Sequence, residues 1–213
     1  MDLILFGVQG SGKGTQARKL AQALGLTIFE TGRELRLLAK EATELGQKVR
    51  KITESGQLVS DAVVLEIVRS FLQKNSGGVI FDGIPRSRQQ WILLEEECKK
   101  GKRRSLALAL VLDSKIALER LLERKTCSNC GQIFGAADKL QSYLCPACGG
   151  ELKVRVDDQA AAIRTRIEIY ERETKPLLKE YAAAGRLIEV PAKQAVEAVT
   201  AEILTRLREF ENH

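Results

Sequence analysis

The sequence predicts an α/β fold, in which a parallel sheet carries helices on both faces. Two observations support this prediction. Short, continuously apolar segments alternate along the chain with longer segments of helical periodicity. The first apolar segment, residues 3–8, leads directly into a glycine-rich turn that a helical pattern follows. Because strands that alternate with helices pair in parallel through crossover connections, we expect the sheet to be buried on both faces.

The expected elements follow in order. We predict strands at residues 3–8, 26–31, 78–83, 105–113 and 185–190. We predict helices at residues 14–25, 33–55, 60–74, 87–100, 114–125, 157–184 and 195–210. Gly25 is a plausible end for the first helix, and Ser60 with Asp61 caps the third. Residues 126–156 are rich in Cys and Gly and lack helical periodicity, so they form an insertion in the sheet domain.

The composition is that of a soluble globular protein, with 44% hydrophobic and 29% charged residues among 213. No segment approaches the roughly 18 apolar residues of a membrane helix, and the start of the chain lacks the basic leader of a signal peptide. We therefore expect a cytoplasmic protein, in which disulfides are rare. The net charge of +6 favours an anionic partner, and nucleotides and nucleic acids both qualify.

The glycine-rich turn predicts a phosphate-binding loop. Gly7-x-x-x-x-Gly12-Lys13 lies between a predicted strand and a predicted helix, which is the context that this motif requires. Backbone N–H groups and the helix dipole favour an anion there, and Lys13 reaches the outer phosphates. Gly14 stands where the usual motif has Ser or Thr, so the hydroxyl moves to Thr15. The loop residues expected to contact the nucleotide are Gly10, Ser11, Gly12, Lys13, Gly14 and Thr15.

The inserted segment predicts a metal site. Cys127, Cys130, Cys145 and Cys148 form two Cys-x-x-Cys pairs separated by 14 residues, one fewer than the usual spacing of a zinc site. Four thiolates leave no open coordination position, so the zinc would be structural. Reduced, unliganded cysteines or two local disulfides are the alternatives. Cys98 stands apart on a predicted helix.

Five stretches, taken in order, resemble the nucleoside monophosphate kinases, and the adenylate kinases in particular. They are GKGTQ (12–16), ETGRELR (30–36), GQLVSD (56–61), FDGIPRSRQQ (81–90) and RVDDQ (155–159). The resemblance covers nearly the whole chain. It implies a core domain at 1–29, 60–125 and 157–213, an acceptor-binding flap at 30–59, and a zinc-bearing mobile lid at 126–156.

The resemblance also implies roles for individual residues. Lys13, Arg86, Arg120, Arg124, Arg155 and Arg166 would act on the phosphates, and Asp82 would order water on Mg²⁺. ATP would further contact Arg120, Arg124, Ile133, Phe134 and Gln194. AMP would contact Thr31, Gly32, Arg36, Gln57, Leu58, Val59, Gly83, Arg86, Gln90, Arg155 and Arg166. Asp157 and Asp158 would lock the closed lid.

Residue chemistry agrees with these roles in two respects. The planar guanidinium of arginine binds two phosphate oxygens at once. The carboxamide of Gln90 carries a donor and an acceptor, which suit the N1 and N6 atoms of adenine.

The sequence departs from the family pattern at two places. Arg33 stands where the family usually has Asp, and this reverses a charge beside the acceptor site. Phe134-Gly135 replaces a common Tyr-His pair of the lid, so only apolar contact with adenine remains there.

The resulting expectation is a monomeric enzyme that reversibly transfers the γ-phosphoryl group of MgATP to AMP, giving two ADP. The acceptor phosphate is already ionised, so no general base is needed, and the only histidine is His213. A kinase for UMP, CMP or GMP is the alternative within the same class. A nucleic-acid-binding protein with zinc knuckles is a second alternative. Phe134 and Tyr143 are the only aromatic residues of the knuckle segment, and its basic residues are not clustered, which disfavours that role.

Overall fold

A computed structural model describes residues 1–212 except 56, 136–137, 139, 141 and 156–157. Its central sheet has five strands, all parallel, in the order β2-β3-β1-β4-β8. These strands are β1 (Asp2–Phe6), β2 (Thr27–Glu30), β3 (Val79–Asp82), β4 (Ser105–Val111) and β8 (Leu187–Pro191). The helices of the core are α1 (Lys13–Leu24), α4 (Asp61–Lys74), α5 (Arg88–Lys100), α6 (Ser114–Leu122), α7 (Ala160–Ile169), α8 (Leu178–Ala183) and α9 (Val196–Glu211).

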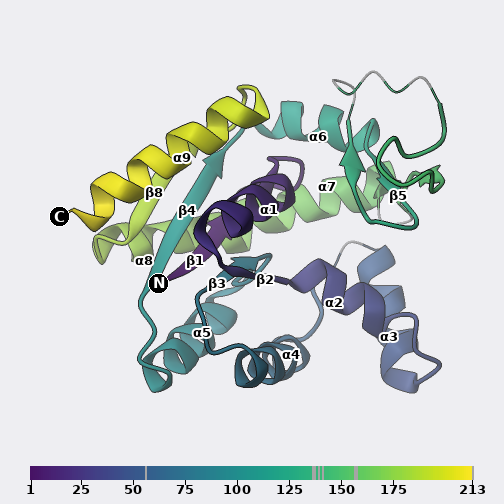
Figure 1. The fold of residues 1–213 in the computed structure, drawn as a ribbon. Helices are drawn as coiled ribbons and strands as arrows, with labels where there is room; N and C mark the ends of the chain where they lie inside the picture. The colour runs from purple at the N-terminus through teal and green to yellow at the C-terminus, as the bar shows by residue number, and fades with distance from the viewer. Residues whose placement is uncertain (56, 136–137, 139, 141, 156–157, 213) are drawn as a thin grey trace.

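Helices cover both faces of the sheet, which confirms the predicted fold class (Figure 1). Alternate side chains of β1 point to opposite faces, as a strand requires. Leu3 and Leu5 pack with residues of α1 and α9, whereas Ile4 and Phe6 pack with residues of α4, α5 and α8. Both layers are therefore built from the apolar stripes that the sequence shows.

The parallel arrangement places the carboxyl ends of all five strands at one edge. The register pairs Leu5 of β1 with Asp82 of β3, so the loop after β1 and the end of β3 are neighbours. In open α/β sheets, ligands bind outside this edge. The fold thus brings the predicted phosphate loop and the FDGIPRSRQQ stretch together.

The segment between β2 and α4 contains two helices where the periodicity predicted one. They are α2 (Thr31–Leu38) and α3 (Glu44–Glu54). Thr43 is the N-cap of α3, and its hydroxyl accepts a hydrogen bond from the Gly46 backbone N–H at 3.0 Å. The Arg50 guanidinium donates to the Ala39 carbonyl at the end of α2. The interruption was missed because the polar stretch between the helices holds no Gly or Pro.

The cysteine-rich insertion forms a small antiparallel sheet, which the sequence did not predict. Its strands are β5 (Lys125–Cys127), β6 (Ile133–Phe134) and β7 (Leu152–Lys153), in the order β6-β5-β7. Strands of two or three residues are too short to show a period of two. In Figure 1 both insertions project from the same end of the core, at the right of the view, with α2 and α3 below and β5 above.

The helical region predicted at 157–184 is not one regular helix. Between α7 and α8 lie a π-helical segment, η3 (Tyr170–Thr174), and a 3₁₀ segment, η4 (Lys175–Leu177). Pro176 has no backbone N–H to donate, which accounts for the irregularity at η4. Within the described residues, none of the helices is both long and apolar enough to cross a membrane.

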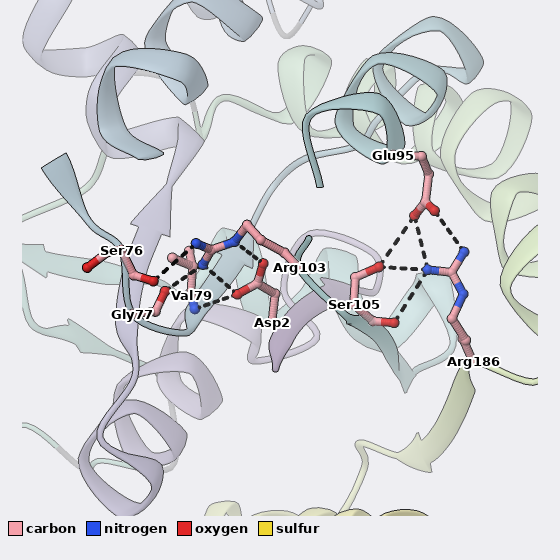
Figure 2. A network of polar contacts seen from close by, with 8 residues as sticks. All are labelled: Asp2, Ser76, Gly77, Val79, Glu95, Arg103, Ser105 and Arg186. Atoms are coloured by element: carbon pink, nitrogen blue, oxygen red, sulfur yellow. Dashed lines mark hydrogen bonds and ion pairs between the residues drawn. The ribbon is translucent and has the colours of Figure 1, made fainter. Parts of the chain in front are cut away.

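The amino ends of the strands carry two polar networks (Figure 2). Arg103 donates to both carboxylate oxygens of Asp2, at 2.6 and 2.7 Å, and Asp2 also accepts from the Val79 N–H. Arg186 donates to Glu95 at 2.8 Å and to the Ser105 hydroxyl at 2.7 Å. A cavity of about 700 Å³ opens beside the first network, at the edge opposite the predicted phosphate loop.

Candidate active site

The loop after β1 has the backbone geometry of an anion cradle. Gly10 and Gly12 have φ values of 90° and 95°, which side chains rarely adopt. A Cβ atom on Gly10 would also lie 2.7 Å from the Ala117 carbonyl oxygen. Gly12 is the N-cap of α1, so the free N–H groups of the first helical turn face the loop. The loop therefore presents donors and a helix N-terminus to the same point.

Lys13 lies across this loop. Its Nζ atom donates to the carbonyl oxygens of Gly7 at 2.6 Å and Val8 at 3.0 Å. The pKa of Lys13 is lowered to about 8. Burial is the main cause and the charges of Arg86, Arg166 and Arg124 add to it, while the charge of Asp82 raises the pKa. A phosphate group placed here would raise the pKa of Lys13 and so stabilise its charged form, because a nearby negative charge favours the ammonium.

Asp82 ends β3 beside the start of α1. A Cβ atom on Gly14 would lie 3.4 Å from the Asp82 carboxylate, so the two residues face each other directly. Burial raises the pKa of Asp82, the nearby Glu30 raises it further, and Lys13 opposes both. A buried carboxylate next to a phosphate loop fits Mg²⁺, which proteins bind through one or two carboxylates together with phosphate oxygens.

Arginines from four separate segments converge on the same region. Arg86 follows β3, Arg124 follows α6, Arg155 leaves the lid and Arg166 lies on α7. Burial lowers the pKa of Arg86 to about 10, and the charge of Arg166 contributes most among the neighbours. Burial and the charge of Arg155 likewise lower the pKa of Arg124. This mutual repulsion makes the region a strong candidate for binding a polyanion.

Asp158 pairs with two of these arginines. Arg124 donates from Nε to its Oδ2 at 2.7 Å and from a terminal nitrogen to its Oδ1 at 2.5 Å, and Arg166 donates to Oδ1 at 3.2 Å. The Asp158 side chain is fully buried. Asp157, its predicted companion in lid closure, lies outside the described residues.

Several residues predicted to contact AMP lie near one another, around Gly83 and Arg86. Thr31 begins α2 and is 3% exposed, and its hydroxyl has no partner within the described residues. The same holds for the hydroxyl of Ser11 in the loop. Buried polar atoms usually have a hydrogen-bond partner, so both hydroxyls have capacity for one more. Arg36 pairs with Glu30 at 2.9 Å.

Other acceptor residues differ in their exposure. Gly83 adopts a φ of 90° and touches the Arg86 guanidinium. Val59 is buried in the main core, Leu58 is half-buried and Gln57 is exposed. Gln90 is buried and hydrogen-bonded within the protein. Arg33, the departure from the family pattern, is exposed on α2.

Phe134 packs inside the cysteine-rich insertion. Phe134 is 4% exposed and packs with Leu152 and the two buried cysteines in the lid's own small core. A segment of this size has few apolar side chains, so the Phe134 ring makes up a large part of its core. The contact of Phe134 with adenine stays a prediction. Its neighbour Ile133 is half-buried, because alternate residues of a strand face opposite ways.

The donor side includes Arg120 and the loop after β8. Arg120 donates to the carbonyl oxygens of Ala192 at 3.2 Å and Lys193 at 3.4 Å. The exposed Gln194 follows directly. Arg120 thus fixes the loop on which Gln194 lies.

The four lid cysteines form one cluster. All four Sγ atoms lie within 4.8 Å of one another, with Cys127 and Cys148 at 3.5 Å and Cys130 and Cys145 at 3.7 Å. A tetrahedron with metal–sulfur bonds of about 2.3 Å has edges of about 3.8 Å, which agrees. The group can therefore hold a metal ion, and the alternative of two local disulfides within the Cys-x-x-Cys pairs is not what the structure shows, because all five cysteines are free.

Both cysteine pairs have the same local turn. Gly131 and Gly149 follow the pairs with φ values of 72° and 69°. Their N–H groups donate back to the carbonyl oxygens of Cys127 and Cys145. The backbone N–H of Cys130 donates to the Cys127 sulfur at 3.5 Å, a contact that stabilises negative charge on that sulfur. This favours the thiolate, which is the form that binds metal.

Two residues near the site were not predicted from the sequence. Asp61 was expected only to cap α4, but its carboxylate contacts Gln90 and Ser87. The Thr174 hydroxyl, in the π-helical segment, donates to the Arg86 carbonyl at 2.8 Å. These partners are 29 and 88 residues apart in the chain, and no local pattern could have indicated them.

Comparisons with known proteins agree with this site. The family model described as "Adenylate kinase" matches residues 5–186. A curated "Adenylate kinase" of Geobacter sp. (strain M21) is 38% identical over 213 residues, covering 98% of this chain and all of that protein. Proteins of the same name from Bacillus licheniformis and Archaeoglobus fulgidus are each 36% identical over 208 residues, covering 95% of this chain and 96% of theirs. Since both the family model and these relatives span most of its length, the chain belongs to the adenylate kinase family.

Proposed function

We propose that this protein is an ATP:AMP phosphotransferase that converts MgATP and AMP reversibly into two ADP. The observation that carries the proposal is the convergence of Lys13, Arg86, Arg124, Arg155 and Arg166 beside Asp82, at the carboxyl edge of the sheet. Family membership supports it, because its relatives carry the name adenylate kinase. Phosphoryl transfer depends mainly on positioning and charge stabilisation, and this cluster is suited to both.

The proposed mechanism assigns the donor phosphates to the loop. The N–H groups of residues 10–15 would hold the β- and γ-phosphates, and Lys13 would exchange its carbonyl partners for phosphate oxygens. Mg²⁺, when bound, neutralises phosphate charge, and Asp82 is the carboxylate placed to hold its water ligands. Arg120 would position the loop carrying Gln194 against the base.

The acceptor phosphate would lie among Arg86, Arg155 and Arg166. Arg36 would bind it after leaving Glu30, and Thr31 and Gln90 would face the adenine. The acceptor oxygen is already ionised, so no side chain has to remove a proton. The guanidinium groups stabilise charge on the transferred group, and they do so most strongly once water is excluded.

We assign a closing movement to each of the two insertions. Residues 30–59 would close over AMP, and residues 126–156 would close over ATP, with Asp157 and Asp158 locking the lid. Asp158 supports this, since it already holds Arg124 and Arg166 together. Closure would exclude water, which would otherwise hydrolyse ATP.

Zinc is the proposed lid metal. Four thiolates in tetrahedral spacing, at the ends of two glycine turns, are the ligand set of structural zinc sites. The ion would stabilise the lid and take no part in the chemistry. We further expect a monomer, as the family resemblance implies, and a cytoplasmic location. Size-exclusion chromatography tests the oligomeric state.

The test is an initial-rate assay of ADP formation with MgATP and equal concentrations of AMP, GMP, CMP or UMP. We expect turnover with AMP to exceed that with each other acceptor by at least tenfold. Preference for GMP, CMP or UMP would mean that the protein is a kinase for that nucleoside monophosphate. Absence of turnover with all four, from folded and zinc-loaded protein, would overturn the proposal.

A further inference from the structure

Gln90 is held at both ends of its side-chain amide. The Nε2 group donates to Asp61 Oδ1 at 2.8 Å, and the Oε1 atom accepts from the Arg86 backbone N–H at 2.8 Å. Gln90 lies in the first turn of α5 and is 2% exposed. The two partners come from different elements, since Asp61 begins α4 and Arg86 lies in the loop after β3.

These partners permit only one orientation of the amide. An ionised carboxylate only accepts hydrogen bonds, so it can face only the nitrogen of Gln90. A backbone N–H only donates, so it can face only the oxygen. Rotating the amide by 180° would place its NH2 group against the Arg86 N–H, donor against donor. It would also place its oxygen against the Asp61 carboxylate, acceptor against acceptor. The order of donor and acceptor at Gln90 is therefore built into the fold.

Asp61 is itself held in place. The Ser87 hydroxyl donates to both of its carboxylate oxygens, at 3.1 and 3.2 Å. The same hydroxyl accepts from the Gln90 backbone N–H at 3.1 Å and so caps α5. Asp61, Ser87 and Gln90 thus form a closed ring of hydrogen bonds between α4 and α5, and a shift of one member displaces the others.

The remaining capacity of Gln90 is one N–H and one oxygen lone pair. Adenine presents an acceptor at N1 and a donor at N6, which this pair satisfies. Hypoxanthine presents a donor at N1 and an acceptor at O6. It would require the reversed amide, which Asp61 and the Arg86 N–H disallow.

We propose that Asp61 is a positioning residue that sets the base specificity of the acceptor site by fixing the orientation of the Gln90 amide. This inference rests on the proposed function, since it concerns the AMP side of that reaction. Asp61 does not touch the nucleotide in this account. It acts through Gln90, and the Arg86 N–H links the base-facing amide to the residue that would hold the acceptor phosphate.

The test compares AMP with IMP, which differ only at the edge of the base that Gln90 faces. In Asp61→Ala we expect KM for AMP to rise about tenfold, while kcat and KM for MgATP stay within about twofold. We expect KM for IMP to change little, so that the AMP preference narrows about tenfold, which is about 1.4 kcal/mol. Glu66 is an exposed carboxylate on the same helix, so Glu66→Ala is the control. This variant should leave KM for AMP and KM for IMP unchanged.

Asp61→Asn separates the hydrogen bond from the charge. Its carbonyl oxygen can still accept from Gln90 Nε2, so we expect at least half of the lost AMP preference to return. A ratio of KM for IMP to KM for AMP that is unchanged in Asp61→Ala would overturn the inference. Equal losses for AMP and IMP, or Asn behaving like Ala, would also overturn it. Failure of the wild-type protein to use AMP at all would instead overturn the proposed function.

Discussion

Lys13 illustrates how a single residue is prepared for a ligand. Its ammonium group is satisfied by two loop carbonyls, yet burial and three arginines keep its pKa near 8. A group that loses charge easily in the free protein gains most from a bound polyanion. The same reasoning applies to Arg86, whose pKa is also lowered by burial and by a neighbouring arginine.

The pH dependence of kcat/KM for MgATP tests the state of Lys13. Below about pH 8 the side chain is protonated and binds phosphate; as pH rises through 8 the free protein loses this charge. We therefore expect kcat/KM to fall on the basic side with an apparent pKa near 8. Lys13→Ala should lower kcat by at least about 100-fold, and its kcat/KM should show no fall near pH 8. Its unfolding temperature should equal that of the wild-type protein. Flat kcat/KM up to pH 10 in the wild-type protein would contradict the assignment.

Among the elements, the lid depends most on its metal ligands. Its apolar cluster contains Phe134, Leu140, Leu152 and two of the cysteines, and its strands have two or three residues. So small a core contributes little to stability, and a bound ion substitutes for it. This also explains why Phe134 packs inward.

Cys127→Ala should release zinc and lower the unfolding temperature. The expected fall is at least about 5 °C, or about 2 kcal/mol in a chain of this size. Part of the activity should remain at low temperature, because the phosphate-binding residues of the core are unaffected. Metal analysis and thermal melting check this. Cys98→Ala, which alters a buried cysteine of the main core, should keep its zinc. Unchanged zinc in the Cys127 variant would contradict the four-thiolate site.

At the scale of the whole molecule, the two edges of the sheet have different tasks. The carboxyl edge gathers Lys13 and several arginines, whose charges lower one another's pKa. The amino edge carries well-paired networks, with Asp2–Arg103 and Glu95–Arg186 joining separate strands and helices (Figure 2). We infer that the second edge stabilises the fold that the first edge strains.

Asp2→Ala tests this division. It leaves Arg103, which is 14% exposed, without its buried partner, so we expect a loss of about 3 kcal/mol in the free energy of unfolding. Kinetic constants at 25 °C should be unchanged, because the change lies at the opposite edge from the site. Glu202→Ala removes the partner of Arg206 in an exposed pair and should cost under about 1 kcal/mol. Urea titration measures both losses. A raised KM in Asp2→Ala with wild-type stability would refute the division.

Much of this architecture was predictable from the sequence because it is locally encoded. The apolar strands, the glycine loop and the paired cysteines each carry a pattern over a few residues, and the structure confirms them. The break between α2 and α3 and the short lid strands carry no such pattern. The contacts of Gln90 with Asp61, and of Thr174 with Arg86, depend on distant segments meeting. The burial of Phe134 likewise depends on packing with Leu152 and two cysteines, which lie elsewhere in the segment.

The central claim is that the protein transfers a phosphoryl group between two bound nucleotides. The most direct test of this claim uses ADP as the only nucleotide. Protein with MgADP as the sole nucleotide should produce ATP and AMP in equal amounts, which separation of the nucleotides by anion-exchange chromatography quantifies. Lys13→Ala should slow both products equally. Equal and simultaneous appearance of the two products is the result that this account predicts. Failure to form ATP from ADP, or release of inorganic phosphate in place of ATP, would contradict it.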